Sequence, residues 1–250
     1  MLAGRVQKPA GRALIIHGLL DDTDIAACHE AAREWPHQCE LGQCDGGGPC
    51  AAIICDALQG RPHDQAIIPG YFPGSSHGNE HLPTGQQSLH TILYLHRERF
   101  LQTHAPAQQL WQKLDQAVRS PPKEWSPPGA PLPWTAKARS LSVRCIELHS
   151  YAPGAGLVDP NHRDEGSVLS ISVLLSDPDL VGGGGRFVTF DDEPGAEHTG
   201  EPIVHELAKG DAILFRSQDR HNVSTVTSGI RQSLVIEMWD AETNITDRFS

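Results

Sequence analysis

The chain has 250 residues, 38% of them hydrophobic, which is enough to bury a core and excludes a wholly disordered chain. Its formal net charge of −11 argues against a nucleic-acid-binding protein, because such proteins usually carry a basic surface. The 24 glycines and 19 prolines predict many turns and few long helices, which favours a β-rich fold.

The first 140 residues predict helices and irregular segments. A short strand within 12–20 leads into a helix from Thr23 to Trp35, with aspartates before it as N-cap candidates. Residues 38–88 are irregular, and a segment of that length is usually functional or disordered. Its cysteines, Cys39 to Cys55, have spacings that match a zinc site poorly, so we expect free thiols.

The next segment carries the strongest helical pattern in the chain. Residues 89–119 predict two helices that break at Pro106, and the proline-rich residues 120–134 predict a covering loop. We expect residues 1–140 to pack on a core formed by the rest of the chain and to shape the substrate pocket, with 38–88 and 120–134 as candidate lids.

From residue 141 onward the apolar pattern changes to a period of two, which is typical of strands. The expected strands are 144–151, 167–175, 187–190, 203–207, 212–215 and 231–239. Six or more strands in about a hundred residues predict a β-sandwich or barrel over 141–250. With the N-terminal region, this core is expected to form one compact domain.

Three side chains in this region have the pattern of a metal site. His162 and Asp164 stand two residues apart on an extended segment, so their side chains point the same way. Together with His221 from a distant strand they form the two-histidine, one-carboxylate set that is typical of Fe(II) oxygenases. Zinc is the main alternative, since it accepts the same ligands.

An arginine on the last strand distinguishes between these metals. Arg231 and Ser233 share one face of that strand, whereas the opposite face carries apolar residues that belong in a core. A buried guanidinium needs an anionic partner, because an unpaired buried charge is costly. A dicarboxylate cosubstrate that chelates iron at one end and pairs with Arg231 at the other meets this need.

A series of short motifs joins these residues. They are, in chain order, Tyr151-x-x-Gly154, His162-x-Asp164, Gly184-Gly185-x-Phe187, Lys209-Gly210-Asp211-Ala212-x-Leu214-Phe215, His221-x-Val223 and Val226-x-x-Gly229-x-Arg231-x-Ser233-Leu234. Over residues 141–239 their order and spacing resemble the prolyl-4-hydroxylase-like branch of the 2-oxoglutarate- and Fe(II)-dependent dioxygenases. The resemblance implies a mainly β fold, with a double-stranded β-helix (jelly-roll) core and flanking helices.

The resemblance also implies the chemistry. It assigns Fe(II) to His162, Asp164 and His221, and the far carboxylate of 2-oxoglutarate to Arg231, with Ser233 and Tyr151 as helpers. It implies a dioxygenase that hydroxylates, or otherwise oxidises, an unactivated C–H bond, uses O2 and releases succinate and CO2, with ascorbate as a further candidate cofactor. The expected substrate is a small molecule, an amino acid or a peptide.

Two acids are candidate substrate contacts. Glu147 shares a strand face with Tyr151, and Glu237 shares one with Arg231. If both strands line the mouth of the barrel, these acids predict a substrate with a cationic or hydrogen-bond-donating group, such as an amine or a guanidine. The alternative is that one or both pair with an internal base, such as Arg144 or Arg186. We expect His198 and His205, which lie between the ligands in sequence, to be surface residues.

Two other functional classes share parts of this pattern. An AlkB-like oxidative demethylase of nucleic acid has the same metal ligands, but the acidic charge disfavours a nucleic-acid partner. A catalytically silent jelly-roll binding module is disfavoured by the intact ligand set and Arg231. No apolar run approaches the roughly 20 residues of a membrane-spanning helix, and the N-terminus makes a poor signal peptide. We therefore expect a cytoplasmic protein without membrane contact, and the sequence leaves its oligomeric state open.

Overall fold

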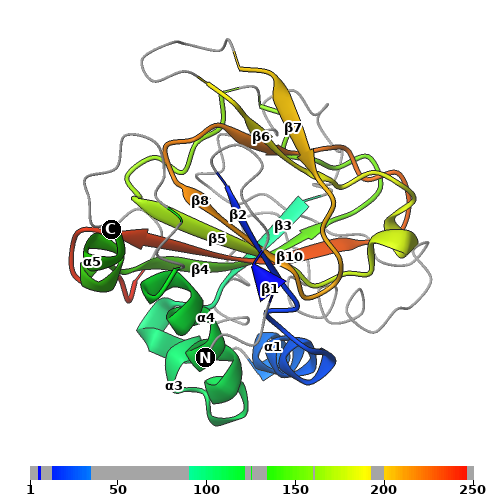
Figure 1. The fold of residues 1–250 in the computed structure, drawn as a ribbon. Helices are drawn as coiled ribbons and strands as arrows, with labels where there is room; N and C mark the ends of the chain where they lie inside the picture. Colours follow the sequence, from blue (N-terminus) through cyan, green and yellow to red (C-terminus); the bar gives the residue numbers. More distant parts are fainter. Residues whose placement is uncertain are drawn as a thin grey trace.

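Two antiparallel sheets form the centre of the molecule (Figure 1). The computed structural model describes residues 5–6, 13–34, 90–121, 125, 134–159, 161–192 and 200–246. The larger sheet has the order β1 (Arg5–Val6), β2 (Leu14–His17), β8 (Ala212–Arg216), β5 (Leu169–Leu174), β10 (Arg231–Trp239), β4 (Ser142–Tyr151) and β3 (His90–Tyr94). The smaller has the order β7 (Pro202–His205), β6 (Phe187–Phe190) and β9 (His221–Val223), and Leu157 forms an isolated bridge with Val223. This is the expected mainly β, jelly-roll architecture with flanking helices.

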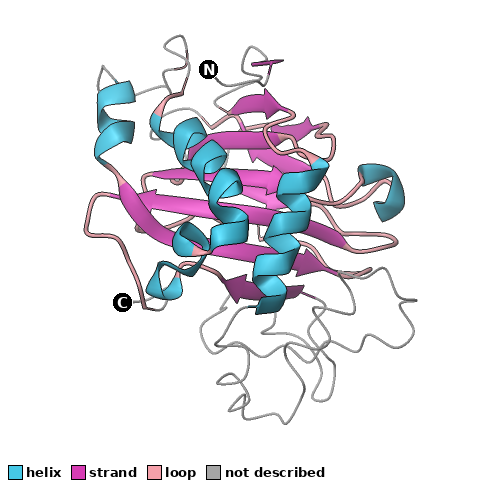
Figure 2. Cartoon of the chain, turned by 90° about the horizontal axis from the view of Figure 1, so that it is seen from below, coloured by secondary structure: helices cyan, strands magenta, loops and turns pink. Residues whose placement is uncertain are grey.

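Helices cover the outer face of the larger sheet (Figure 2). They are α1 (Asp22–Glu34), α3 (Phe100–Thr103), α4 (Gln108–Arg119) and α5 (Trp134–Ser140), with short 3-10 turns at Arg97–Arg99, Ala105–Ala107 and Pro178–Val181. The start of α1 is fixed by a reciprocal pair of caps, since the backbone N–H groups of Asp21 and Asp24 each donate to the other residue's carboxylate at 3.0 Å. No helix among the described residues is long and apolar enough to cross a membrane.

The strand alternation divides the buried side chains into two cores. On β10, Leu234, Ile236 and Met238 pack toward the helices together with Leu110 and Leu114 of α4. On its other face, the larger sheet packs against the smaller one through a second cluster that includes Phe187, Phe215 and Val223. The expected division of β10 into an apolar face and a face with Arg231 and Ser233 is therefore confirmed. Buried polar side chains, among them Arg231 and Ser233, also lie between the two sheets.

The segment 89–119 was predicted to be two helices, and its first part is a strand instead. β3 pairs antiparallel with β4, with Ile92 opposite His149 and Tyr94 opposite Glu147. Leu93, whose spacing suggested a helix, packs in the core beneath the sheet. Non-local pairing outweighs local helical spacing here. Helical structure follows later in the segment, as the short α3 and then α4, whose buried face has the expected spacing.

Strands from both sides of residue 140 build the larger sheet, because β2 pairs with β8 and β3 pairs with β4. The cysteines Cys39 to Cys55 and the irregular residues 38–88 lie outside the described residues.

Candidate functional site

A cavity of about 360 Å³ opens between the two sheets, within the range of about 300–1,000 Å³ that is usual for small-ligand sites. It is lined by residues of β3, β4, β5, β8 and β10 from the larger sheet, of β6 and β9 from the smaller one, and of the segment between β4 and β5. The lining includes His162, Asp164, His221, Glu147 and Glu237. The expected metal ligands and the expected substrate contacts therefore share one cavity.

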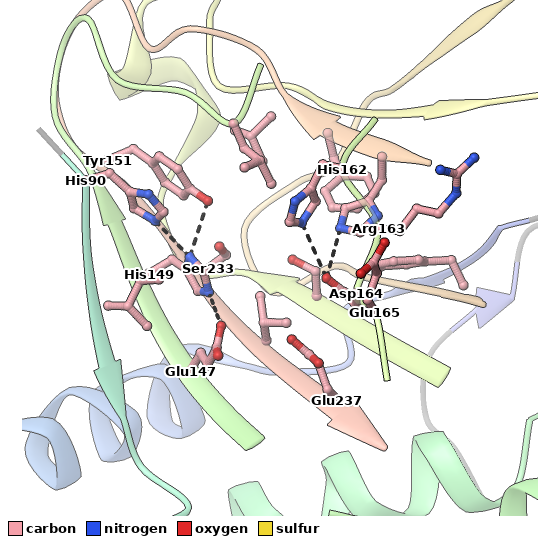
Figure 3. A pocket seen from close by; sticks show the side chains of 18 of the residues that line it. His90, Glu147, His149, Tyr151, His162, Arg163, Asp164, Glu165, Ser233 and Glu237 are labelled. Atoms are coloured by element: carbon pink, nitrogen blue, oxygen red, sulfur yellow. Dashed lines mark hydrogen bonds and ion pairs between the residues drawn. The ribbon is translucent and has the colours of Figure 1, made fainter. Parts of the chain in front are cut away.

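The three expected metal ligands come together in this cavity, and Figure 3 shows His162 beside Asp164. His162 and Asp164 lie in the segment between β4 and β5, and His221 is the first residue of β9. The Oδ1 atom of Asp164 lies 3.4 Å from Nε2 of His162 and 3.5 Å from Nε2 of His221. A metal ion bound by all three side chains would therefore contact Oδ1 of Asp164 and the Nε2 atoms of the two histidines.

The backbone joins the two ligand segments directly. The N–H of His221 donates to the carbonyl of His162 at 3.2 Å, and the N–H of Asp164 donates to the carbonyl of Ser217 at 2.9 Å. Nδ1 of His221 lies 3.1 Å from the carbonyl of Asp219, and since a carbonyl only accepts, Nδ1 carries the proton. Nε2, the ring nitrogen that faces Asp164, is therefore the atom of His221 that could bind a metal ion.

Aromatic packing fixes the ring of His221. It stacks on Phe187 with an interplanar angle of 12° and contacts Phe215 with a centroid distance of 4.6 Å. The His162 ring meets it edge-on, with the centroids 4.7 Å apart. The imidazole of His221 is thus held in one orientation by side chains of both sheets.

The electrostatics of the triad favour a charged carboxylate. Burial alone would raise the pKa of Asp164, but the charge of His221 and hydrogen bonds from both histidines outweigh it and hold that pKa well below its usual value. Burial likewise opposes the charge on His221, whereas Asp164 raises its pKa. Asp164 is therefore an anion between two imidazoles, which is the charge state that a metal ligand needs.

These donors fit a divalent metal ion. The ligand atoms of the three residues all lie within 4.8 Å of one another. Ligands about 2.1 Å from an ion and at right angles to each other stand about 3 Å apart, close to the distances from Asp164 to the two histidines. Two neutral nitrogens and one carboxylate oxygen suit iron(II) and leave positions open for other ligands.

Arg231 is the largest of the fully buried side chains, with 1% of its surface exposed. Its Nε donates to the carbonyl of Gly185 at 2.7 Å, and its Nη1 donates to the hydroxyl of Ser233 at 2.9 Å. The guanidinium lies 5.4 Å from the centre of the Tyr151 ring. Among the described residues no carboxylate lies within ion-pair distance of it.

The surroundings of Arg231 fit the far carboxylate of a dicarboxylate. Burial lowers the pKa of Arg231, which means that the interior disfavours its positive charge. A guanidinium nevertheless stays protonated in proteins, so an anion would relieve this cost. Arg231 does not itself line the cavity, but it contacts Ser233 and Tyr151, which do.

The sequence did not identify a hydrogen-bonded chain that crosses the cavity wall (Figure 3). Nε2 of His149 lies 2.8 Å from Glu147 Oε2, and its Nδ1 lies 2.9 Å from Nε2 of His90 and 3.3 Å from the hydroxyl of Tyr151. The His90 ring stacks on Tyr151 with the centroids 4.0 Å apart. Burial, and then the charge of His149, holds the pKa of His90 well below its usual value. The alternation of β4 predicted that His149 lies on this face. His90 was missed, because the segment that contains it was predicted to be helical.

Glu237 has the internal partner that the sequence left as an alternative. Its Oε2 accepts from Nη1 of Arg144 at 3.0 Å and from the hydroxyl of Ser167 at 2.6 Å. Arg144 is the extra residue of a β-bulge, because Glu237 pairs with Cys145 and Met238 pairs with Val143. The bulge places the Arg144 side chain in the cavity lining, against the simple alternation of β4.

His205 was predicted to be a surface residue, and this was wrong. It is buried on β7, where its Nε2 lies 2.7 Å from the hydroxyl of Thr189, and burial lowers its pKa. It takes no part in the cavity lining. His198 lies outside the described residues.

Comparison with known proteins gave matches among solved structures alone. No family model and no curated protein matches the chain. AviO1 from Streptomyces viridochromogenes Tue57 is 18% identical over 95% of this chain and 93% of that one, with a TM-score of 0.50. A prolyl-4-hydroxylase from Pseudomonas putida is 15% identical, covers 93% of this chain and 94% of that one, and has a TM-score of 0.44.

A third structure is described as an oxidoreductase of the 2OG-Fe(II) oxygenase family from Burkholderia pseudomallei, at 17% identity and a TM-score of 0.34. The match covers 58% of each chain, so this chain spans less than two thirds of that structure. At these identities the likeness to AviO1 concerns the fold alone. The function is therefore argued from the side chains of the site.

Proposed function

We propose that this chain is an Fe(II)- and 2-oxoglutarate-dependent dioxygenase that hydroxylates an unactivated C–H bond of a small molecule, an amino acid or a peptide. The observation that carries the proposal is that the chain has both the cluster of His162, Asp164 and His221 and the buried Arg231. The cluster alone suits zinc as well as iron. The buried guanidinium adds the need for an anionic cosubstrate, which a zinc hydrolase does not have.

Each side chain then has a role. His162, Asp164 and His221 hold the metal through Nε2, Oδ1 and Nε2, the atoms that already converge. Arg231 binds the far carboxylate of 2-oxoglutarate, Ser233 orients the guanidinium, and Tyr151 contributes a hydroxyl at the same end. Iron(II) with 2-oxoglutarate and O2 supplies the oxidation of R–H to R–OH, in which 2-oxoglutarate leaves as succinate and CO2.

The chain itself supplies position and shelter from water. The rings of Phe187 and Phe215 fix the His221 imidazole, and Asp219 fixes its tautomer. Asp164 is buried, and its lowered pKa keeps it ionised. A site that is fixed before its ligands arrive loses little free energy to reorganisation when they bind.

Decarboxylation of 2-oxoglutarate tests this function without knowledge of the substrate. We expect wild type with Fe(II) and O2 to release labelled CO2 from carboxyl-labelled 2-oxoglutarate above the rate of iron alone, and Asp164→Ala to fall to that background. His205→Gln is the matched control, because this buried histidine lies outside the cavity lining. Equal release by wild type and Asp164→Ala contradicts the proposal.

We propose further that Glu147 and Glu237 contact the substrate and favour a cationic or hydrogen-bond-donating group, such as an amine or a guanidine. Both line the cavity with 1% of their surface exposed, held by His149 on one side and by Arg144 and Ser167 on the other. Because both carboxylates face the cavity, a donor group of a bound substrate would meet them there.

Turnover of Glu237→Gln and Glu147→Gln on matched cationic and neutral substrates tests this role. We expect turnover of the cationic substrate to fall more than turnover of the neutral one, because the variants keep the shape of the side chain and remove its charge. An equal loss of turnover on both substrates would contradict the proposed contact of these acids with the substrate and would leave the metal assignment unchanged.

A further inference from the structure

The two carboxylate oxygens of Asp164 have different surroundings. Oδ1 faces the Nε2 atoms of His162 and His221. Oδ2 points the other way and accepts a hydrogen bond from the hydroxyl of Ser170 at 2.5 Å. The hydroxyl is the donor, because an ionised carboxylate only accepts, and hydrogen bonds to ionised groups are among the stronger ones in proteins.

Ser170 is itself held by a second serine. Ser170 lies on β5 and Ser217 follows β8, and their hydroxyl oxygens are 2.8 Å apart. Both side chains are fully buried. A hydroxyl has one proton, and Ser170 gives its proton to the carboxylate, which can only accept. The hydroxyl of Ser217 therefore donates to Ser170, and the chain runs from Ser217 through Ser170 to Asp164 Oδ2.

Ser217 also binds the backbone of Asp164. The carbonyl of Ser217 accepts from the N–H of Asp164 at 2.9 Å, and the N–H of Ser217 donates to the carbonyl of Val168 at 3.2 Å. Asp164 is thus fixed at its backbone by Ser217, which follows β8, and at one carboxylate oxygen by Ser170 of the neighbouring strand β5. Its carboxylate has little freedom to rotate about the bond that joins it to the chain.

We propose that Ser170 and Ser217 are positioning residues that hold Asp164 with Oδ1 turned toward His162 and His221. With Oδ2 bound to Ser170, Oδ1 is the oxygen left to face a metal ion between the two histidines. Without the serine hydroxyls the carboxylate could turn away from this orientation, so a metal ion would be held less tightly. This inference rests on the metal role proposed above for Asp164.

The strand offers a matched control for Ser170. Ser172 lies two residues along β5 on the same face, about 7 Å away at the usual rise of a strand. It is also buried and lines the cavity, and no hydrogen bond joins it to Asp164 in the described part of the chain. Ser172→Ala removes the same hydroxyl from the same strand face without touching the serine pair.

Metal affinity tests the inference without turnover. Mn(II), whose free ion gives a sharp electron paramagnetic resonance signal, is titrated into Ser170→Ala, Ser217→Ala, the double variant and Ser172→Ala. Outer partners of metal ligands typically change affinity by about 10- to 100-fold, so we expect Ser170→Ala to weaken Mn(II) binding by that factor. Ser217→Ala should weaken it less, and Ser172→Ala should match wild type within about twofold.

The double variant is the sharpest comparison. Because the Ser217 hydroxyl acts through Ser170, the double variant should bind Mn(II) no more weakly than Ser170→Ala alone. Additive losses, or a Ser170→Ala affinity equal to that of wild type or Ser172→Ala, overturn the inference. If Ser170→Ala does not fold, judged by circular dichroism, the Ser217→Ala affinity decides, and an unchanged value overturns the inference.

Asp164→Ala separates this inference from the proposed function. If that variant loses Mn(II) while Ser170→Ala and Ser217→Ala keep wild-type affinity, the serine pair is structural and the metal site stands. If Asp164→Ala binds Mn(II) as tightly as wild type, the metal assignment itself fails, and the role of the serine pair fails with it.

Discussion

Replacement of Arg231 by methionine separates a cosubstrate role from a structural one. In the ligand-free protein the guanidinium is buried with two neutral partners, Gly185 and Ser233. Loss of two hydrogen bonds costs about 1–3 kcal/mol each, and removal of an uncompensated buried charge returns a similar several kcal/mol. We therefore expect Arg231→Met to change the free energy of unfolding of the ligand-free protein by less than about 2 kcal/mol.

The effect on 2-oxoglutarate is much larger. Two charge-assisted hydrogen bonds at about 1.5–3 kcal/mol each predict a loss of roughly 100- to 10,000-fold in affinity. At 100 times its Kd, 2-oxoglutarate should stabilise the metal-loaded wild type by about 2.7 kcal/mol, and the same concentration should stabilise Arg231→Met by well under 1 kcal/mol.

Urea unfolding with and without 2-oxoglutarate measures both quantities in one series. Arg119→Met is the control, because Arg119 lies in the helix layer and pairs with Asp115 at the surface. A loss above about 4 kcal/mol for ligand-free Arg231→Met would indicate a structural arginine. An equal gain from 2-oxoglutarate in wild type and Arg231→Met would refute the cosubstrate role.

Three further predictions follow from buried groups. Burial lowers the pKa of His29 to about 4. As the pH falls, this imidazole therefore takes up a proton in the unfolded chain before it does so in the folded protein. Stability is therefore lost as the pH falls from about 6.5 toward 4, by roughly 3 kcal/mol at most; His29→Gln should flatten that part of a urea-midpoint curve, and a parallel curve contradicts this. Burial raises the pKa of the Cys28 thiol to about 12, so mass spectrometry should find Cys28 unlabelled by iodoacetamide at pH 8 in the folded protein and labelled in urea; labelling of the folded protein contradicts it. Gly185 and Gly183 both have positive φ, but a Cβ on Gly185 would lie 2.8 Å from Cδ of Arg231, whereas one on Gly183 meets nothing within 4 Å. Gly185→Ala should therefore unfold about 1–3 kcal/mol more easily than Gly183→Ala and bind 2-oxoglutarate more weakly by calorimetry, and equal behaviour of the two variants refutes the contact.

Strand periodicity predicted the parts of the site that follow from one strand at a time. Alternation placed Arg231 beside Ser233, and the hydrogen bond between them confirms it. It also placed Glu147 and Tyr151 on one face of β4, and both line the cavity. The mainly β fold with flanking helices was predictable for the same reason, since the C-terminal strands alternate clearly.

What the sequence missed depends on pairing between distant segments. His90 reaches the site because β3 pairs with β4, and the local spacing around it indicated a helix. Arg144 enters the cavity because the register of β10 against β4 shifts at Glu237, which no single strand reveals. His205 is buried by the pairing of β6 with β7, although its local pattern is that of a short exposed strand.

The most direct test of the central claim is the visible spectrum of the protein with Fe(II) and 2-oxoglutarate in the absence of O2. A chelate of 2-oxoglutarate on iron held by His162, Asp164 and His221 gives a weak charge-transfer band. We predict this band for wild type and its loss in His162→Ala. No band with wild type, or an unchanged band in His162→Ala, would contradict the iron and 2-oxoglutarate assignment.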